Sequence, residues 1–343
     1  MERFGQGYQD YIQSPLQPLT DNLESITYEV FEKDPVKYEW YENAVAAALK
    51  DLRAKFGDDR EIIVAVVGAG RGPLVTRSLR ASKSTGIAIK CCAVEKNPNA
   101  HVLIQRRNQT DPLWNNRVLI YKSDMRTWPG PTINGAIQQV DILVSELLGS
   151  FADNELSPEC LDGVQHVLHP DHGINIPQSY SAHLTPIATP KLYTDILTRP
   201  GEADKWEVPA VVMLHQYDYL CTHPSAPNTT DLHTPSVKET WSFSHPLPTS
   251  LLTQAFIRAG GSIDCGGWTG GDGKNEHNAR TSKVSFHSAR RGVCHGLAGY
   301  FETVLYAPAD GGKKIELSTN PVTMEEKSRD MISWFPIFFP LKV

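Results

Sequence analysis

The sequence is short of cysteine, and the six cysteines that it has form no C-x-x-C pair and no regular spacing. This pattern excludes a disulfide-stapled secreted fold, so we expect reduced thiols in a cytoplasmic and nuclear protein. One group of thiols and imidazoles in the second half matches no standard zinc spacing, so no metal site is predicted. The group consists of Cys265, His277, His287, Cys294 and His295.

Targeting segments and an excess of positive charge are lacking as well. The first residues carry no apolar stretch of the kind found in a secretory signal peptide. Apolar runs such as Ile62 to Val67 are far too short to cross a bilayer, so no membrane partner is expected. Lys and Arg number 33 against 39 Asp and Glu, which gives a net charge of −6. Proteins that bind a phosphate backbone are normally basic, so direct nucleic-acid binding is not expected, whereas a cationic substrate is compatible with the charge.

The first half of the chain alternates between helical and strand-like segments. Within an amino-terminal segment of residues 1–55, residues 20–55 carry apolar side chains at helical spacing, with a break at Pro35. Ile62 to Val67 reads as a buried strand, and Pro73 follows a glycine turn as the first residue of a helix. Three more strand-like runs end close to acidic residues, namely Glu95, Asp124 and Glu146. This order predicts a doubly wound α/β domain over residues 56–172, preceded by a helical segment.

The second half has a different character. From Gly173 onward, short strand-like runs are separated by Pro, Gly, Asn and Thr, which is typical of antiparallel β structure in a sandwich or barrel. We therefore predict a β domain over residues 173–343. Two polar stretches within it, residues 224–235 and 260–282, read as surface loops.

The glycine turn after the first strand indicates a nucleotide-like cofactor. Gly68, Gly70 and Gly72 alternate with other residues, and Pro73 stands where a dinucleotide fingerprint needs its third glycine. This spacing is typical of S-adenosylmethionine sites. Glu95 lies at the tip of the next strand, where its carboxylate would accept both ribose hydroxyls, although NAD enzymes place an acid there too.

Asp124 follows the third strand, where its carboxylate would receive an adenine amino group beside the backbone of Met125. Taken alone, this aspartate could equally be a turn acid or a helix cap. Three such features in order on successive strand tips favour S-adenosylmethionine as the cofactor. An NAD(P)-dependent oxidoreductase stays open as an alternative at this point.

Two glutamates, Glu146 and Glu155, bracket an apolar loop after the fourth strand. Open α/β sheets bind ligands at this carboxyl edge. Apolar neighbours shield the acids from water, which is unfavourable unless a cation joins them. A guanidinium fits best because its planar fork matches paired carboxylates. The loop therefore predicts a binding site for an arginine side chain.

The loop from Ser145 to Glu155 also resembles the double-glutamate loop of protein arginine methyltransferases. Its continuation through Gly163 resembles the type 5 (type II) members, which make symmetric dimethylarginine. Further segments that resemble this family are residues 28–35 (YEVFEKDP), 94–100 (VEKNPNA), 299–306 (GYFETVLY) and 333–336 (SWFP). The likeness extends over nearly the whole chain. It implies a Rossmann-like, S-adenosylmethionine-dependent methyltransferase domain followed by an antiparallel β-barrel domain.

The resemblance also implies roles for single residues. The two glutamates would hold the target guanidinium, with Trp334 against its face, and Phe31 would set the product, where asymmetric methylators carry methionine. Lys37 would meet the methionine carboxylate of the cofactor, and Tyr28 and Tyr38 would close over it. The cofactor pocket would be lined by Gly68, Gly70, Gly72, Glu95, Asp124 and Met125. Without the resemblance, the two aromatic residues beside the guanidinium read as core side chains and the lysine reads as an exposed helix residue.

In three respects the chain departs from that family. The amino-terminal TIM-barrel domain, which docks a WD-repeat partner, is missing, so that partner is not expected to bind. The chain stops at Val343, before the family's final strands, so we expect an incomplete barrel. Residues 260–282 look like an insertion. The expected partners are arginine-containing proteins such as histone tails and Gly/Arg-rich proteins, together with a second copy of the chain. A truncated, non-catalytic relative that only binds partners is the remaining alternative.

Overall fold

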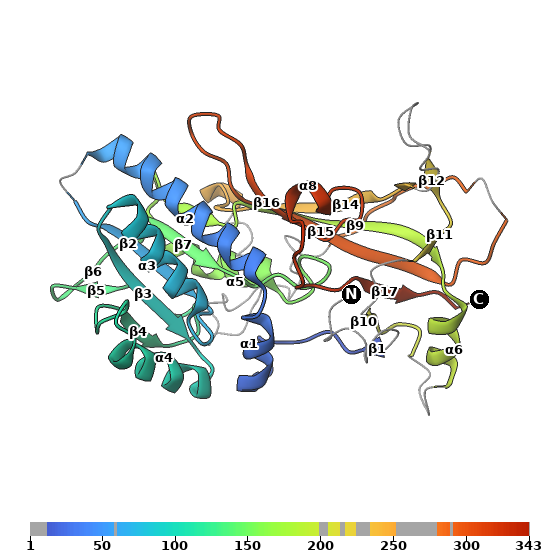
Figure 1. The fold of residues 1–343 in the computed structure, drawn as a ribbon, viewed down its shortest axis with the longest axis horizontal. Coiled ribbons are helices and arrows are strands. Elements are labelled where there is room, and N and C mark those ends of the chain that lie inside the picture. The colour runs from blue at the N-terminus through green and yellow to red at the C-terminus, as the bar shows by residue number, and fades with distance from the viewer. Residues whose placement is uncertain are drawn as a thin grey trace.

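The computed structural model describes residues 12–57, 60–198, 205–212, 217–223, 234–251, 280–288 and 291–342. Two sheets dominate the fold: a parallel sheet flanked by helices and a long antiparallel sheet beside it (Figure 1). No helix within these ranges is long and apolar enough to cross a membrane.

Some predicted features lie outside the described residues. These are Cys265, His277 and most of the two polar stretches at 224–235 and 260–282. Within the part of the chain that the structure describes, no group of three or more His, Cys, Asp or Glu side chains could hold a metal ion.

The first sheet contains five parallel strands in the order β4-β3-β2-β7-β8. Their bounds are β2 Ile62–Val67, β3 Ile89–Glu95, β4 Leu119–Lys122, β7 Ile142–Ser145 and β8 Ile174–Ile176. The chain runs from β2 outward through β3 to β4 and then returns to β7 on the other side of β2. The winding therefore reverses beside β2, and open α/β sheets bind ligands at the carboxyl edge of such a switch point. The predicted doubly wound domain is confirmed.

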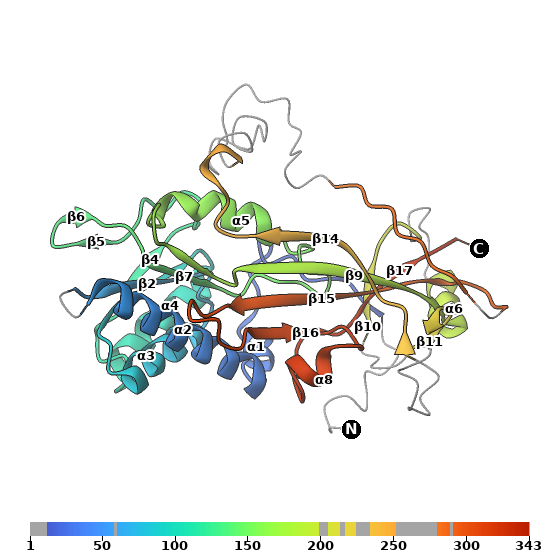
Figure 2. The ribbon, with the colours of Figure 1, turned by 90° about the horizontal axis from the view of Figure 1, so that it is seen from above.

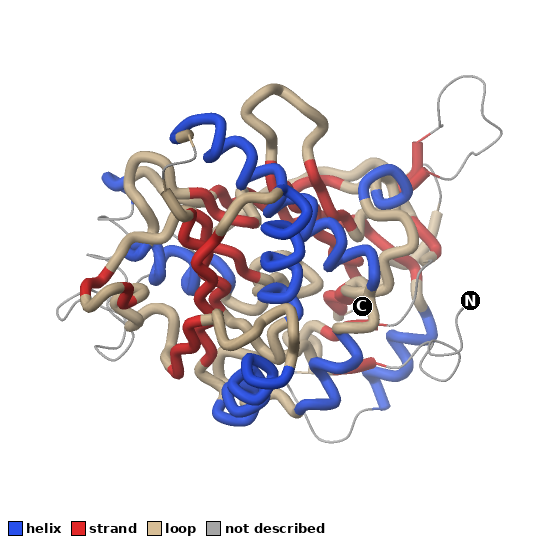
Figure 3. Tube along the Cα trace, turned by 60° about the vertical axis from the view of Figure 1, so that its left-hand side comes forward, coloured by secondary structure: helices blue, strands red, loops and turns tan. Residues whose placement is uncertain are grey.

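Helices cover this sheet on both faces (Figure 3). Their bounds are α2 Pro35–Phe56, α3 Pro73–Thr85, α4 Pro98–Thr110 and α5 Ser157–Val164, and a shorter helix, α1 Ser25–Phe31, precedes them. Val64 and Val66 of β2 share one apolar cluster with α2 and α3, whereas Ala65 and Val67 share another with α5. β2 is thus buried on both faces, which explains its continuous run of apolar residues. The predicted helical break at Pro35 separates α1 from α2.

The second sheet is antiparallel, with the order β1-β10-β17-β15-β9-β11, and β14 pairs with β9 while β16 pairs with β15. Its strands are β1 Ile12–Gln13, β9 Ser179–Ala188, β10 Ala210–Val212, β11 Asp218–Tyr219, β14 Lys238–Ser244, β15 Gly296–Tyr306, β16 Ile315–Ser318 and β17 Ile337–Pro340. Figure 2 shows β14, β9, β15 and β16 side by side. This sheet fits the barrel-like β domain that the sequence predicts for the second half.

Several short elements complete the described chain. They are the hairpin β5 Thr132–Ile133 and β6 Ala136–Ile137, the antiparallel pair β12 Thr222–His223 and β13 Thr234–Pro235, the 3-10 turn η1 Gln165–Val167, and the helices α6 Pro190–Thr198 and α8 Met324–Lys327.

The two sheets are connected more closely than the predicted boundaries at residues 55 and 172 suggest. β1 precedes α1 in the chain, yet Ile12 pairs with Val212 in the antiparallel sheet. A strand of two residues shows no periodicity, so no sequence pattern could reveal this pairing. At the other end, β8 extends to Ile176 and still belongs to the parallel sheet.

Candidate active site

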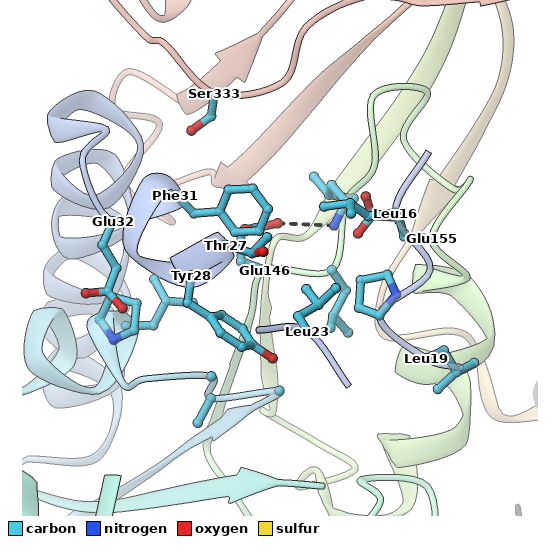
Figure 4. Close-up of a pocket in the computed structure, with 18 of the residues that line it drawn as sticks. Leu16, Leu19, Leu23, Thr27, Tyr28, Phe31, Glu32, Glu146, Glu155 and Ser333 are labelled. Carbon is cyan, nitrogen blue, oxygen red and sulfur yellow. Dashed lines mark hydrogen bonds between the residues drawn. The ribbon is translucent and has the colours of Figure 1, made fainter. Parts of the chain in front are cut away.

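A cavity of about 820 Å³ opens at the carboxyl edge of the parallel sheet (Figure 4). Its walls come from α1, the start of α2, the tips of the strands and the segment around Trp334. Twelve of the thirteen residues predicted for the site line this cavity. They are Tyr28, Phe31, Lys37, Tyr38, Gly68, Gly70, Glu95, Asp124, Met125, Glu146, Glu155 and Trp334. The structure thus brings these residues together in one cavity, although they come from distant parts of the chain.

The glycine turn lets side chains from the opposite wall approach the backbone. Gly68 and Gly70 have φ values of +68° and +54°, which glycine adopts without a steric penalty. A Cβ atom at Gly70 would lie 3.0 Å from the ring of Tyr28, and one at Gly68 would lie 3.0 Å from Leu147. Both positions therefore need glycine for their backbone conformation and for close packing.

Gly72 serves packing rather than the cavity. It precedes α3 with a φ of +85°, and a Cβ atom there would lie 2.5 Å from the buried ring of Trp114. Gly72 is not among the residues that line the cavity, so its predicted place at the cofactor stays a prediction. The sequence could not show the contact with Trp114 because the tryptophan is brought against the turn by tertiary packing.

Glu95 ends β3 and is buried. Its Oε2 accepts a hydrogen bond from the N–H of Gly70 at 2.6 Å, and its Oε1 accepts one from the N–H of Asn97 at 2.7 Å. Burial raises the pKa of this carboxyl group, and the backbone hydrogen bonds offset part of the effect. A carboxylate has about four acceptor positions, so capacity remains for hydroxyl groups in the cavity.

Asp124 is engaged as a turn acid, one of the readings that the sequence leaves open. Its Oδ1 accepts hydrogen bonds from the backbone N–H and the Nε of Arg126, both at 3.0 Å, and its Oδ2 accepts one from Nη2 at 2.8 Å. Burial alone would raise its pKa, but these hydrogen bonds hold the pKa below the usual value. No sequence motif points to Arg126. Asp124 still lines the cavity, together with Met125.

The backbone of the double-glutamate loop and of the residue that follows Glu155 has an unusual conformation. Ala152 and Leu156 have φ values of +61° and +63°, a region that residues with a side chain seldom adopt. Such a conformation persists only where the surrounding structure holds it. Asp153 Oδ1 accepts a hydrogen bond at 3.0 Å from Nε1 of Trp241, which lies on β14. The antiparallel sheet thus helps to fix the position of the second glutamate relative to the first.

The two glutamates have different surroundings. Glu146 accepts a hydrogen bond from Nζ of Lys37 at 3.2 Å through Oε2 and one from the N–H of Leu148 at 3.3 Å through Oε1. Burial and the nearby charge of Glu146 raise the pKa of Glu155 well above its usual value, and the charge of Lys37 offsets only part of this rise. Glu155 therefore keeps its proton to a higher pH than an ordinary glutamate does.

Three aromatic rings surround the ammonium group of Lys37. Its Nζ lies 4.6 Å from the ring centroid of Trp334, 5.0 Å from that of Tyr38 and 5.4 Å from that of Phe31. Such contacts stabilise a cation that has been removed from water. Trp334 has a φ of +63° and donates a hydrogen bond from Nε1 to the carbonyl oxygen of Leu148 at 2.7 Å. The cavity is therefore built to hold a cation between a carboxylate and aromatic side chains.

Asp34 is a structural residue of this site that the sequence analysis misses. Its Oδ1 accepts the N–H of Lys37 at 3.0 Å and caps α2. Its Oδ2 accepts the N–H groups of Ile332 and Ser333 at 3.0 and 2.7 Å. An acid before Pro35 signals a helix cap, but its second pair of partners lies 298 and 299 residues away in the chain. Asp34 thus connects the lysine to the segment that carries the tryptophan.

Two family models match almost the entire chain. The model described as PRMT5 arginine-N-methyltransferase matches residues 1–176, and the model described as PRMT5 oligomerisation domain matches residues 179–343. The chain belongs to the PRMT5 arginine-N-methyltransferase family. The predicted resemblance to type 5 protein arginine methyltransferases is confirmed. The two family models divide between β8 and β9, where the parallel sheet ends and the antiparallel sheet continues.

Curated members of the PRMT5 family share the matched part of the sequence. The chain is 43% identical over 343 residues to protein arginine N-methyltransferase skb1 of Schizosaccharomyces pombe, covering 100% of this chain and 47% of the relative. It is also 43% identical over 347 residues to protein arginine N-methyltransferase 5 of Xenopus laevis, covering 99% of this chain and 46% of the relative. The chain therefore spans about half the length of these relatives.

Solved methyltransferase structures share the fold at low sequence identity. The Trypanosoma brucei PRMT1 enzyme-prozyme heterotetrameric complex with AdoHcy matches with a TM-score of 0.61 at 16% identity, over 93% of this chain and 82% of that chain. Arabidopsis thaliana protein arginine methyltransferase 10 matches with a TM-score of 0.57 at 15% identity, over 92% and 83%. These matches confirm the predicted fold class, a Rossmann-like methyltransferase domain followed by a barrel-like β domain.

Proposed function

We propose that this chain is a protein-arginine N-methyltransferase, which transfers methyl groups from S-adenosylmethionine to arginine side chains. The observation that carries the proposal is the cation site between Glu146 and the aromatic rings, in the same cavity as the glycine turn. Membership of the PRMT5 family supports it, as does the AdoHcy in the Trypanosoma brucei complex of similar fold. Histone tails and Gly/Arg-rich proteins are the proposed substrates.

The lining residues fit S-adenosylmethionine. Glu95 retains acceptor positions toward the cavity for the ribose hydroxyls, and Asp124 with Met125 lines the part that would take the adenine. Tyr28 and Tyr38 would cover the cofactor from α1 and α2. When bound, S-adenosylmethionine supplies a methyl group on a positively charged sulfur, which makes that methyl group an electrophile.

The residues of the chain would prepare the other reactant. An arginine guanidinium has a pKa of about 12.5–13.8, and its nitrogens are poor nucleophiles because the charge is delocalised. Glu146 and Glu155 would bind two sides of the group and draw positive charge toward the nitrogens that they contact. Phe31 and Trp334 would exclude water, which strengthens these electrostatic contacts. Holding the guanidinium in one orientation contributes much of the rate.

Substrate binding is expected to release a proton from Glu155. The pKa of this carboxyl is raised by burial and by Glu146. A bound guanidinium lowers the pKa again because an opposite charge favours the carboxylate. At a pH between the two pKa values, binding of a Gly/Arg-rich peptide releases up to about one proton, so affinity rises with pH. The measurement is isothermal titration calorimetry in buffers of different ionisation enthalpy, with S-adenosylhomocysteine present.

The matched variant for this measurement is Glu155→Gln, in which no proton release is expected. Apparent binding enthalpies for the unmutated chain that do not depend on the buffer would contradict the assignment of the proton to Glu155.

We further propose type II activity, with symmetric dimethylarginine as the product. A monomethylated arginine has to re-enter the cavity, and the space beside it decides which nitrogen is exposed. The Phe31 ring centroid lies 5.4 Å from Nζ of Lys37, which pairs with Glu146, and both Phe31 and Glu146 line the cavity (Figure 4). Methionine is unbranched and adaptable, so it would make way for either arrangement. Phe31→Met is therefore expected to yield a measurable share of asymmetric dimethylarginine.

The assay is mass spectrometry with isomer-resolving fragmentation on a Gly/Arg-rich peptide. Val30→Met, with an exposed side chain on the same helix, serves as the control and is expected to keep the product symmetric. Purely asymmetric product from the unmutated chain would refute type II activity. An unchanged ratio of symmetric to asymmetric dimethylarginine in Phe31→Met would show that Phe31 does not determine the product.

The alternatives open at the sequence level are less favoured. Pro73 begins α3 at the position where a dinucleotide site has its third glycine, and membership of the PRMT5 family favours methyl transfer over hydride transfer. It also favours a catalytic chain over one that only binds partners. A thermal-unfolding assay distinguishes a methyltransferase from an oxidoreductase: S-adenosylmethionine is expected to raise the melting temperature, and NADH is not. Detection of methylated peptide by mass spectrometry distinguishes a catalytic chain from one that only binds partners.

The match to an oligomerisation model supports a further proposal, that residues 179–343 form a homo-oligomer. Light scattering coupled to size-exclusion chromatography measures this directly, and a mass equal to that of one chain would argue against it.

A further inference from the structure

Lys37 places a positive charge of the protein itself inside the proposed substrate site. Its side chain is 2% exposed, and its Nζ lies 3.2 Å from Glu146 Oε2. The rings of Trp334 and Phe31 face the same ammonium group, at 4.6 and 5.4 Å from their centroids. These three partners are the ones that the proposed function assigns to the target guanidinium.

Two cations bound to one buried carboxylate repel each other. At close range in an environment of low polarity this repulsion is far stronger than in water. The ammonium of Lys37 and an arriving guanidinium therefore compete for Glu146.

The competing group is the free end of an anchored residue. The N–H of Lys37 is held by Asp34 at 3.0 Å, so the backbone at this position stays with the start of α2. The ammonium group stands on a flexible four-carbon stem, which lets it exchange one anion for another. Lys37 lines the cavity together with Glu95 and Gly70 of the proposed cofactor region, so both regions share one space.

We propose that Lys37 exchanges partners: it pairs with Glu146 in one state and with the carboxylate of the bound cofactor in the other. Cofactor binding would then free Glu146 for the target arginine and strengthen substrate binding. The inference rests on the proposed function, because it presupposes that S-adenosylmethionine and an arginine side chain share this cavity. It goes beyond that function because it predicts an order of binding, in which the cofactor binds before the substrate.

The experiment measures the affinity of the full chain for a Gly/Arg-rich peptide by isothermal titration calorimetry. It uses two saturating nucleosides, S-adenosylhomocysteine and 5′-(3-aminopropylthio)-5′-deoxyadenosine, which differ only in the carboxylate. We expect the peptide to bind about tenfold more tightly with S-adenosylhomocysteine, a typical coupling between two sites. Linkage requires the reverse as well: the peptide has to strengthen binding of S-adenosylhomocysteine about tenfold more than it strengthens binding of the nucleoside without the carboxylate.

A variant without the ammonium group tests the residue itself. In Lys37→Met the apolar stem is retained, and the peptide is expected to bind equally well with both nucleosides. Lys33→Met is the matched control, since Lys33 is exposed and also lines the cavity, and it is expected to keep the tenfold difference. If Lys37→Met does not fold, the peptide affinities measured with the two nucleosides on the unmutated chain still test the exchange of partners.

The possible failures are distinguishable. Equal peptide affinities with the two nucleosides, each of them bound, would overturn the exchange and leave the proposed function standing. A difference that persists in a folded Lys37→Met chain would overturn it too. Binding of neither nucleoside nor peptide by the unmutated chain would overturn the proposed function and the exchange together.

Discussion

Replacing Glu146 by glutamine is expected to lower methyl transfer by about a hundredfold or more, because it removes one electrostatic stabiliser from a site shielded from water. The amide keeps the shape of the carboxylate and an acceptor for Lys37, which lies 3.2 Å away. Binding of S-adenosylhomocysteine is expected to be retained, since the carboxylate belongs to the cation site. Single-turnover methylation of a Gly/Arg-rich peptide and calorimetric titration measure the two quantities separately.

The chain offers a matched control for this substitution. Glu316 also forms an ion pair with a lysine, Lys327, at 3.1 Å, but it does not line the cavity. Glu316→Gln is expected to leave turnover unchanged. Turnover of Glu146→Gln close to that of the control would mean that the double-glutamate loop is merely a solvated acidic loop.

Replacing Gly72 by alanine is expected to lower the free energy of unfolding by about 2–5 kcal/mol, through backbone strain and overpacking. The φ of +85° is unfavourable for any residue with a Cβ atom. The added carbon would also lie 2.5 Å from the ring of Trp114, which is buried and makes a hydrogen bond from Nε1 to Thr76 at 3.0 Å. Chemical denaturation followed by circular dichroism provides the measurement.

The other end of α3 carries the control for this prediction. Gly86 has a φ of +70°, but no atom lies within 4 Å of a Cβ atom built there. Gly86→Ala is therefore expected to cost only the backbone strain, about 1–2 kcal/mol. Equal losses in the two variants would show that the tryptophan moves aside without a penalty and that packing does not explain the glycine.

The parts of the fold that the sequence predicts are those with a local signature. The apolar run from Ile62 to Val67 indicates a strand buried on both faces, and Pro73 after a glycine turn indicates where the next helix begins. Chemistry at the strand tips follows from this, because parallel strands bring their carboxyl ends to one edge. Glu95 and Glu146 are found in this way.

The parts that the sequence does not predict depend on contacts between distant segments. Asp34 has the signature of a helix cap, but nothing local shows that its second oxygen binds the backbone at Ser333. The same holds for the Trp241 side chain, which holds the double-glutamate loop through Asp153. Gly72 fits a cofactor motif, and only the position of Trp114 reveals its structural role. Motifs thus identify the residues that line the cavity better than those that hold them in place.

The pairing of β1 with β10 determines how the cavity is covered. Residues 14–24 run from this pair to α1, and Leu16, Leu19 and Leu23 along them line the cavity. Hydrogen bonds from Lys96 to the carbonyl of Leu19 and from Asn97 to that of Leu23 hold the stretch against β3. A segment fixed at both ends has already lost most of the conformational entropy that a free tail would lose on closing over a ligand. This small strand pair borders the cavity itself through Gln13 and Val211, and by fixing the start of the segment it reduces the disorder that a bound molecule has to suppress.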